Sequence, residues 1–178
     1  MASIGHLAVG LAAGRSYARD PKRVARAMAA FCLLSYLPDF DAIGFKLGIA
    51  YAAPWGHRGA LHSFAVAVLA GLLAGLVGRA FGQKLFRVAL LAFAVIAVHD
   101  VLDTLTDGGL GIALFWPFTN HRYFAPWTPL PVAPIGLGLI SPRGFFVLGV
   151  ELVVFGPLWV YSLWPRPPAA REGRSVVG

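Results

Sequence analysis

The sequence predicts an all-α fold, a polytopic bundle of about four to five membrane helices. Of its 178 residues, 58% are hydrophobic and only 13% are charged, whereas a soluble domain carries about 25% charged residues. Long apolar runs alternate with short loops rich in Lys and Arg. Most His and Asp residues stand at the ends of these runs, so helices of alternating direction would bring them to one membrane boundary.

Charge and cysteine content exclude other classes. Mean hydropathy is +0.71 and the net charge is +7. The basic residues fall between apolar segments without interleaved aromatics, which is typical of topology signals, so we expect no nucleic-acid partner. The single Cys32 excludes an intrachain disulfide and a cysteine-rich zinc site. No positive residue precedes the first short apolar run, so we interpret the N-terminus as mature sequence and not as a signal peptide.

The first apolar run, residues 4–14, predicts a helix too short to cross a hydrocarbon core of about 30 Å. A basic loop follows over residues 15–26. Residues 24–37 predict a second helix that ends at Pro38, because proline interrupts helical hydrogen bonding. Residues 42–55 are expected to form a short interfacial segment.

Residues 61–78 predict a membrane-spanning helix whose glycines allow close packing. A second basic loop, residues 79–87, leads to another span at residues 88–105. The connection from 109 to 142 is rich in proline and aromatic residues, which favours a loop on the headgroup region. Its aromatics either guide an acyl chain or anchor the loop. Residues 144–164 predict the last span.

The distribution of Lys and Arg predicts the orientation. Most lie in the two basic loops and after residue 165, which places these segments in the cytoplasm. The predicted organisation is one membrane-embedded domain, residues 1–164, with a disordered cytoplasmic tail, residues 165–178. The remaining basic residues fall on the opposite side, and they are Lys46, Arg58, Arg122 and Arg143.

This topology gathers imidazoles and carboxylates at the extracytoplasmic end. His99 and Asp103 are four residues apart, so both face one side of a helix, either as two metal ligands or as a hydrogen-bonded pair. Asp39 and Asp41 would repel without a cation, although helix capping is an alternative for each. His6 alone is typical of a packing histidine. The full set is His6, Asp39, Asp41, His57, His62, His99, Asp100, Asp103, Asp107 and His121.

A mixed His and Asp set without thiolates predicts a divalent metal. Zinc is favoured, and manganese or iron is possible; the number of ligands would suit one to three ions. We expect His57 in a loop and His62 in the first helical turn. Arg58, with Arg122 as second choice, is a candidate phosphate ligand, although Arg58 would equally pair with Asp39 or Asp41. Ser63 is expected to cap the following helix.

Four motifs in order resemble a known family over residues 4–120. They are Gly5-His6-x-x-x-Gly10, Pro38-Asp39-x-Asp41, His57-Arg58-Gly-x-x-His62-Ser63 and His99-x-x-x-Asp103. The set resembles the YdjM-type membrane-bound metal-dependent hydrolases, a family named after a LexA-regulated inner-membrane protein and grouped with zinc-dependent phospholipase C and P1 nuclease. Leu61 stands where that family commonly has threonine. The resemblance implies an all-helical phosphoesterase with metal ligands His6, Asp39, His62, His99 and Asp103, and with Asp41 and His57 as further candidates.

The predicted function is a membrane-embedded metal-dependent hydrolase that uses a metal-activated water on a lipid-linked phosphoester. It would reside in the cytoplasmic (inner) membrane of a prokaryote, with the site on the extracytoplasmic side. Asp39, Asp41 and Arg58 are the predicted catalytic residues, and Arg58 and Arg122 the substrate ligands. The alternatives are a metal-ion or proton-coupled transporter, and a metal-stabilised protein without catalysis. Whether Asp100, Asp107, His121 and Glu151 belong to the site is left open.

Overall fold

A computed structural model describes residues 3–165 of the chain. The predicted tail therefore lies outside the described residues, apart from its first position. Every regular element in the described range is helical, and the only β-type pairings there are two isolated bridges. The α-helices are α1 (Ser3–Tyr17), α2 (Pro21–Ser35), α3 (Phe64–Ala80), α4 (Leu85–Thr104) and α5 (Pro142–Leu163). Short 3-10 helices are η1 (Pro38–Phe45), η2 (Ala60–His62) and η3 (Gly136–Leu139).

Side-chain caps and proline set the helix boundaries. Asp20 accepts a hydrogen bond from the backbone N–H of Lys22 and begins α2. Ser63 accepts one from the backbone N–H of Val66 at 3.2 Å, so its predicted role as the cap of α3 is confirmed. α2 ends before Pro38, as predicted, but the chain continues there as η1. The two carboxylates after Pro38 therefore lie on a short helix.

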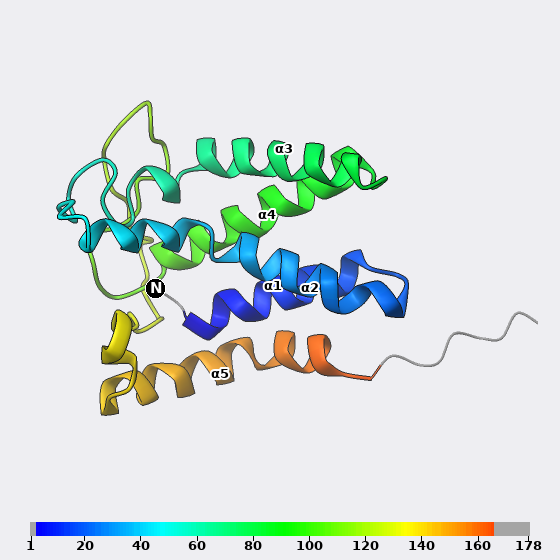
Figure 1. Ribbon diagram of the computed structural model, residues 1–178. Helices are drawn as coiled ribbons and strands as arrows, with labels where there is room; N and C mark the ends of the chain where they lie inside the picture. The colour runs from blue at the N-terminus through cyan, green and yellow to red at the C-terminus, as the bar shows by residue number, and fades with distance from the viewer. Residues whose placement is uncertain (1–2, 166–178) are drawn as a thin grey trace, which may run out of the picture.

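The helices pack as two hairpins and one outer helix. α1 packs against α2, α3 packs against α4, and α5 lies along α1 (Figure 1). Small residues permit the close contact between α1 and α2, because a Cβ at Gly10 would lie 2.6 Å from the Cα of Cys32. The predicted close packing of Gly75 is confirmed, since a Cβ there would lie 2.8 Å from that of Ala89.

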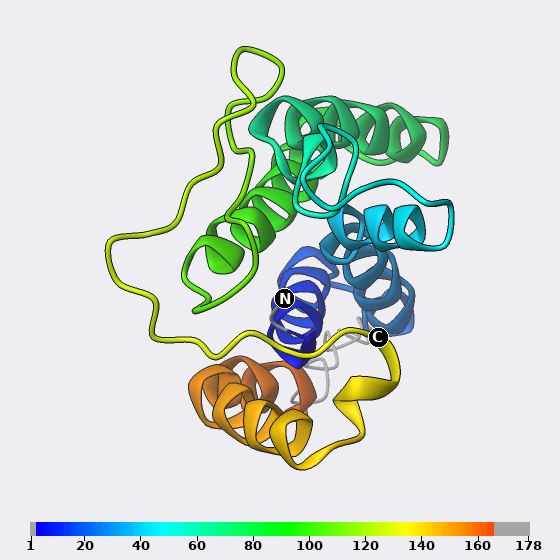
Figure 2. The same cartoon turned by 90° about the vertical axis from the view of Figure 1, so that its left-hand side faces the viewer.

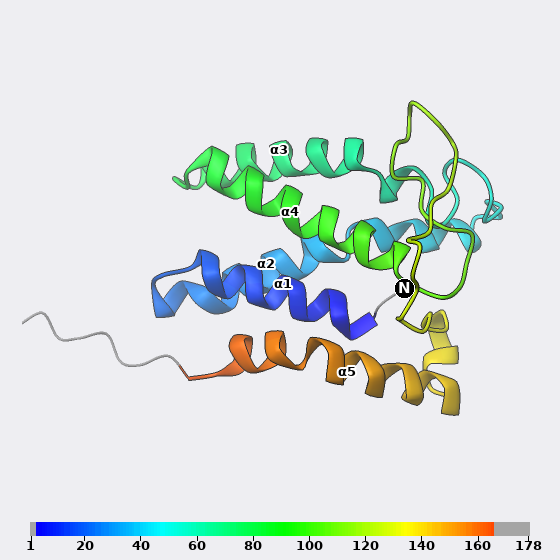
Figure 3. The same ribbon diagram turned by 180° about the vertical axis from the view of Figure 1, so that it is seen from behind.

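The two ends of the bundle differ in what they carry. The α1–α2 and α3–α4 connections lie at one end together with the last turn of α5 (Figures 1 and 3). η1, η2 and the long loops lie at the other end, which Figure 2 presents to the viewer. The structure thus separates the basic connections from the His and Asp motifs, as the alternating pattern predicts.

Two or three segments have the length and composition of membrane spans. α4 and α5 qualify alone, with 20 and 22 residues. α2 and η1 together make a third if they form one span, bent by 49°. α3, predicted to cross as residues 61–78, is apolar but has only 17 residues, because it begins three residues later than expected, after its cap Ser63, and ends two residues later. Residues 109–141 hold no α-helix and contain only the short 3-10 helix η3, so the predicted loop is confirmed up to Pro142, where α5 begins.

Candidate metal centre

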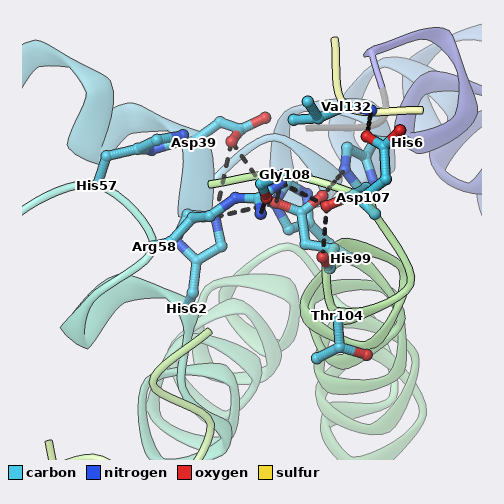
Figure 4. Close-up of polar contacts among 12 residues, drawn as sticks. His6, Asp39, His57, Arg58, His62, His99, Thr104, Asp107, Gly108 and Val132 are labelled. Atoms are coloured by element: carbon cyan, nitrogen blue, oxygen red, sulfur yellow. Dashed lines mark hydrogen bonds and ion pairs between the residues drawn. The ribbon is translucent and has the colours of Figure 1, made fainter. Parts of the chain in front are cut away.

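The predicted ligands come from distant segments and meet at one end of the bundle (Figure 4). α4 carries two of these ligands on one face near its C-terminal end. The 3-10 helices present other ligands from the opposite side. All are buried. They are His6 on α1, Asp39 and Asp41 on η1, His57 in the loop before η2, His62 on η2, and His99 and Asp103 on α4.

Four of these side chains form what we call the donor group: Asp39, His62, His99 and Asp103. One ligand atom from each lies within 4.8 Å of the others. The Nε2 atoms of His62 and His99 are 3.3 Å apart, and Oδ1 of Asp39 lies 3.6 and 3.7 Å from them. A tetrahedral zinc ion with ligands at about 2.0–2.1 Å would separate neighbouring ligand atoms by about 3.3–3.4 Å. The His62–His99 pair has this spacing, and the other separations, 3.6–3.8 Å, are slightly wider, so the donor group could hold a metal ion.

The buried carboxylate of Asp39 supports the same conclusion. Asp39 is only 9% exposed. Neither of its side-chain oxygens accepts a hydrogen bond from the described residues. Burying an ionised carboxylate without hydrogen bonds is costly unless a cation compensates. The residues present fit a divalent metal ion.

His99 is oriented by the end of α2. Its Nδ1 lies 2.7 Å from the carbonyl oxygen of Ser35. A carbonyl can only accept, so Nδ1 carries the hydrogen and the Nε2 lone pair points into the donor group. The Ser35 hydroxyl donates to the carbonyl of His6 at 2.7 Å, and the His6 ring stacks on that of His99. One residue thus ties three helices together beside the site.

Asp41 lies against the second ring nitrogen of His62. The Nδ1 atom of His62 lies 2.9 Å from Oδ2 of Asp41. Asp41 also lies 2.6 Å from Nδ1 of His57 and accepts the backbone N–H of Arg58. A carboxylate that holds the second nitrogen of a metal-binding histidine is a recurrent arrangement. Asp41, His57 and His62 also form a second group with metal-ligand spacing, so His62 borders both groups.

The carboxylates around His62 favour a positive charge at this position. Burial alone would lower the pKa of His62, but the carboxylates of Asp39 and Asp41 outweigh this and raise the pKa to about 10. Either a proton on His62 or a divalent cation between the carboxylates supplies that charge.

A family model of YdjM inner membrane proteins matches residues 1–166. The chain belongs to the YdjM family. It is also 38% identical over 146 residues to inner membrane protein YbcI of Escherichia coli (strain K12), covering 79% of this chain and 84% of that protein. No solved structure matches. Family membership confirms the resemblance and the inner membrane, whereas the relation to phospholipase C and P1 nuclease stays a prediction.

Arg58 occupies the interior of this YdjM-family site. It is 1% exposed, and its guanidinium lies 3.3 Å from Oδ2 of Asp103. It also donates to the carbonyl of Gly108 at 2.7 Å and to the hydroxyl of Thr106 at 2.9 Å. The backbone N–H of Arg58 donates to Asp41, but its side chain pairs with Asp103. The expected side-chain pairing with Asp39 or Asp41 is therefore replaced by one with Asp103. Its predicted catalytic and phosphate-binding role stays a prediction.

Arg122 supports the loop that carries His57. It donates hydrogen bonds to the carbonyls of His57, Tyr51 and Ala53 at 2.9–3.1 Å. Burial lowers the pKa of Arg122, which remains a strong donor. The structure thus gives it a clear part in shaping the site, and its predicted contact with substrate stays a prediction.

Several polar residues stand around the donor group without joining it. His6 lies 3.1 Å from Oδ1 of Asp103, and its predicted ligand role stays a prediction. Glu151 accepts the backbone N–H of Gly5 at 2.9 Å. Asp100 is buried on α4, and Asp107 binds the backbone N–H of Val132 (Figure 4).

Sequence reasoning missed Ser35 and Thr106. Ser35 could have been found in the sequence, because it is a hydroxyl residue in an apolar helix three positions before Pro38. Thr106 lies three residues after Asp103, whose carbonyl accepts its hydroxyl at 2.8 Å. Its contact with Arg58 joins positions 48 residues apart, which no local pattern indicates.

Proposed function

We propose that this chain is a membrane-embedded metal-dependent hydrolase that acts on a phosphoester, with a lipid-linked substrate. One observation carries the proposal. Two imidazole nitrogens face each other at 3.3 Å, flanked by carboxylates, in a buried group that contains no thiolate. This is the donor set of hydrolytic zinc sites, and manganese and iron also suit it.

In this proposal Asp39, His62, His99 and Asp103 hold the metal. A bound divalent ion would supply Lewis acidity, which makes water a better nucleophile and polarises a phosphoryl oxygen. The chain's own residues fix the ligands: Asp41 orients His62, and Arg58 balances the charge of Asp103. The second group, with Asp41 and His57, would accommodate a further ion.

The surface beside Asp39 favours a lipid-linked substrate. Phe40, Ile43 and Leu47 are 55%, 57% and 71% exposed on or just after η1. Asp39 is the least buried member of the donor group. A substrate whose phosphate approaches Asp39 would therefore place its hydrocarbon on an apolar surface. The implied relation to phospholipase C agrees with this class of substrate.

We further propose that the centre faces the extracytoplasmic side and that all five α-helices lie in the membrane. The basic connections lie at the opposite end of the bundle, and cytoplasmic loops carry the excess of Lys and Arg. A cysteine at Lys46, in a Cys32→Ala background, should react with an impermeant maleimide in intact cells. Labelling only after permeabilisation would reverse the orientation.

A metal-stabilised protein without catalysis is the second candidate. The donor group offers four protein ligands, each at most 9% exposed, and structural zinc sites are closed in this way. Catalysis would require Asp39 to leave room for water.

The test uses purified full-length protein in detergent. Metal content is measured by mass spectrometry. Turnover of bis(p-nitrophenyl) phosphate is measured in the purified protein, after chelation of its metal, and after zinc or manganese is added back. Stoichiometric metal with metal-dependent turnover supports the hydrolase. Stoichiometric metal that raises thermal stability, without turnover of this probe or of phospholipids, supports the second candidate. Protein that binds no added divalent metal would contradict both.

A further inference from the structure

We propose that a cavity at the basic end of the bundle binds the phosphate headgroup of an anionic phospholipid. The cavity has a volume of about 690 Å³. It lies at the end opposite the donor group, so it is a separate site and does not depend on the proposed hydrolysis.

The cavity lies between the two hairpin connections. Tyr17 and Asp20 line it from the α1–α2 corner, and Gly78, Phe81 and Gln83 from the α3–α4 corner. Both corners lie at the same end of the bundle in Figure 3. If the basic loops face the cytoplasm, the opening lies at the headgroup level of that leaflet.

Positive charge dominates the lining. Four arginines contribute to it, and Asp20 is the one acidic residue among the lining side chains. Asp20 is already engaged, since it caps α2 and lies 3.5 Å from Nε of Arg23. Arginine binds phosphate through paired, charge-assisted hydrogen bonds, and basic pockets between membrane helices bind anionic headgroups. The four are Arg19, Arg23, Arg26 and Arg87.

One of these arginines is held in place. Arg87 donates to the carbonyl of Tyr17 at 2.9 Å, and its guanidinium carbon lies 4.7 Å from the centre of the Tyr17 ring. The Tyr17 hydroxyl donates to Gln83 at 2.7 Å. These contacts connect the two corners and fix Arg87 before any ligand arrives, which lowers the entropic cost of binding.

The lining favours a lipid over free phosphate. Ala27, Ala30 and Gly78 supply apolar wall, and Phe81 is 78% exposed at its edge. A ligand with a phosphate and adjoining hydrocarbon contacts both kinds of lining, whereas inorganic phosphate contacts the arginines alone.

The test compares lipid binding by native mass spectrometry in dodecyl maltoside, with dioleoylphosphatidylglycerol or dioleoylphosphatidylcholine added. We expect the protein to retain more phosphatidylglycerol than phosphatidylcholine. The bound fraction of phosphatidylglycerol should fall about fivefold in each of the variants Arg26→Gln and Arg87→Gln. Arg79→Gln is the matched control, since Arg79 lies at the same end and does not line the cavity. It removes the same charge and should leave binding unchanged. Unfolding temperatures matching the unsubstituted protein would show that the variants fold.

Equal loss in Arg79→Gln would indicate general charge attraction and would overturn the proposal. Undiminished binding in both cavity variants would do the same. Inorganic phosphate at millimolar concentration should not displace the lipid; full displacement would identify free phosphate as the ligand and contradict a lipid site.

Discussion

The Nε2 atoms of His62 and His99 lie 3.3 Å apart in the buried centre of this protein. The Ser35 carbonyl requires the hydrogen of a neutral His99 ring to be on Nδ1. His99 therefore offers a lone pair toward His62. Two imidazoles in this relation need a proton or a cation between them, and with the adjacent carboxylates they form a group that could hold a metal ion.

His62→Ala should remove most of the bound metal. His62 borders both groups of potential ligands, so its loss leaves each with an open position. We expect at least about a tenfold fall in metal affinity, measured by competition with a chromophoric chelator. His121→Ala is the control, since His121 is exposed and outside both groups. Unchanged affinity in His62→Ala would remove His62 from the site.

Asp41→Asn separates an orienting role from a ligand role. The amide oxygen can still accept the backbone N–H of Arg58, but the negative charge beside His62 is lost. We expect metal affinity to fall about 10- to 100-fold, with the number of bound ions unchanged. A reduced stoichiometry would instead make Asp41 a direct ligand of a second ion.

Arg58→Gln should destabilise the protein because it removes the guanidinium that pairs with the buried Asp103 carboxylate. Breaking a buried ion pair costs about 3–5 kcal/mol. The comparison is Arg143→Gln, which breaks the exposed pair with Asp107 and should cost at most about 1 kcal/mol. Thermal unfolding in detergent measures both. A similar small effect in the two variants would show that Arg58 is not a structural counter-charge.

Metal removal should lower the unfolding temperature. A ligand at about 100 times its dissociation constant adds about 2.7 kcal/mol to the stability of the folded state. Chelation with EDTA should reverse this, and zinc should restore it. In Asp39→Ala the chelator should have little effect, because the donor group is incomplete. Equal sensitivity to EDTA in both proteins would contradict a metal at Asp39.

Local patterns predicted most helices and brought the right side chains to one end. Apolar runs located the helices, and Pro38 and Ser63 marked two boundaries that the structure contains. The contacts of Arg58 were not predictable, because its partners at 103, 106 and 108 lie at the end of α4 or just after it, about 50 residues away in sequence. The orientation of the His99 ring could not be predicted either. Every residue has a backbone carbonyl, and only the fold shows that the carbonyl of Ser35 faces this ring.

Ser35 makes its two contacts through chemically different groups, which has a consequence for mutational tolerance. The bond to His99 uses the main chain and is available to any residue at position 35. The bond to α1 uses the hydroxyl and is lost in Ser35→Ala. Side-chain substitution at this position therefore loosens helix packing while preserving the ring orientation of His99. Only changes that displace the end of α2 itself would alter both.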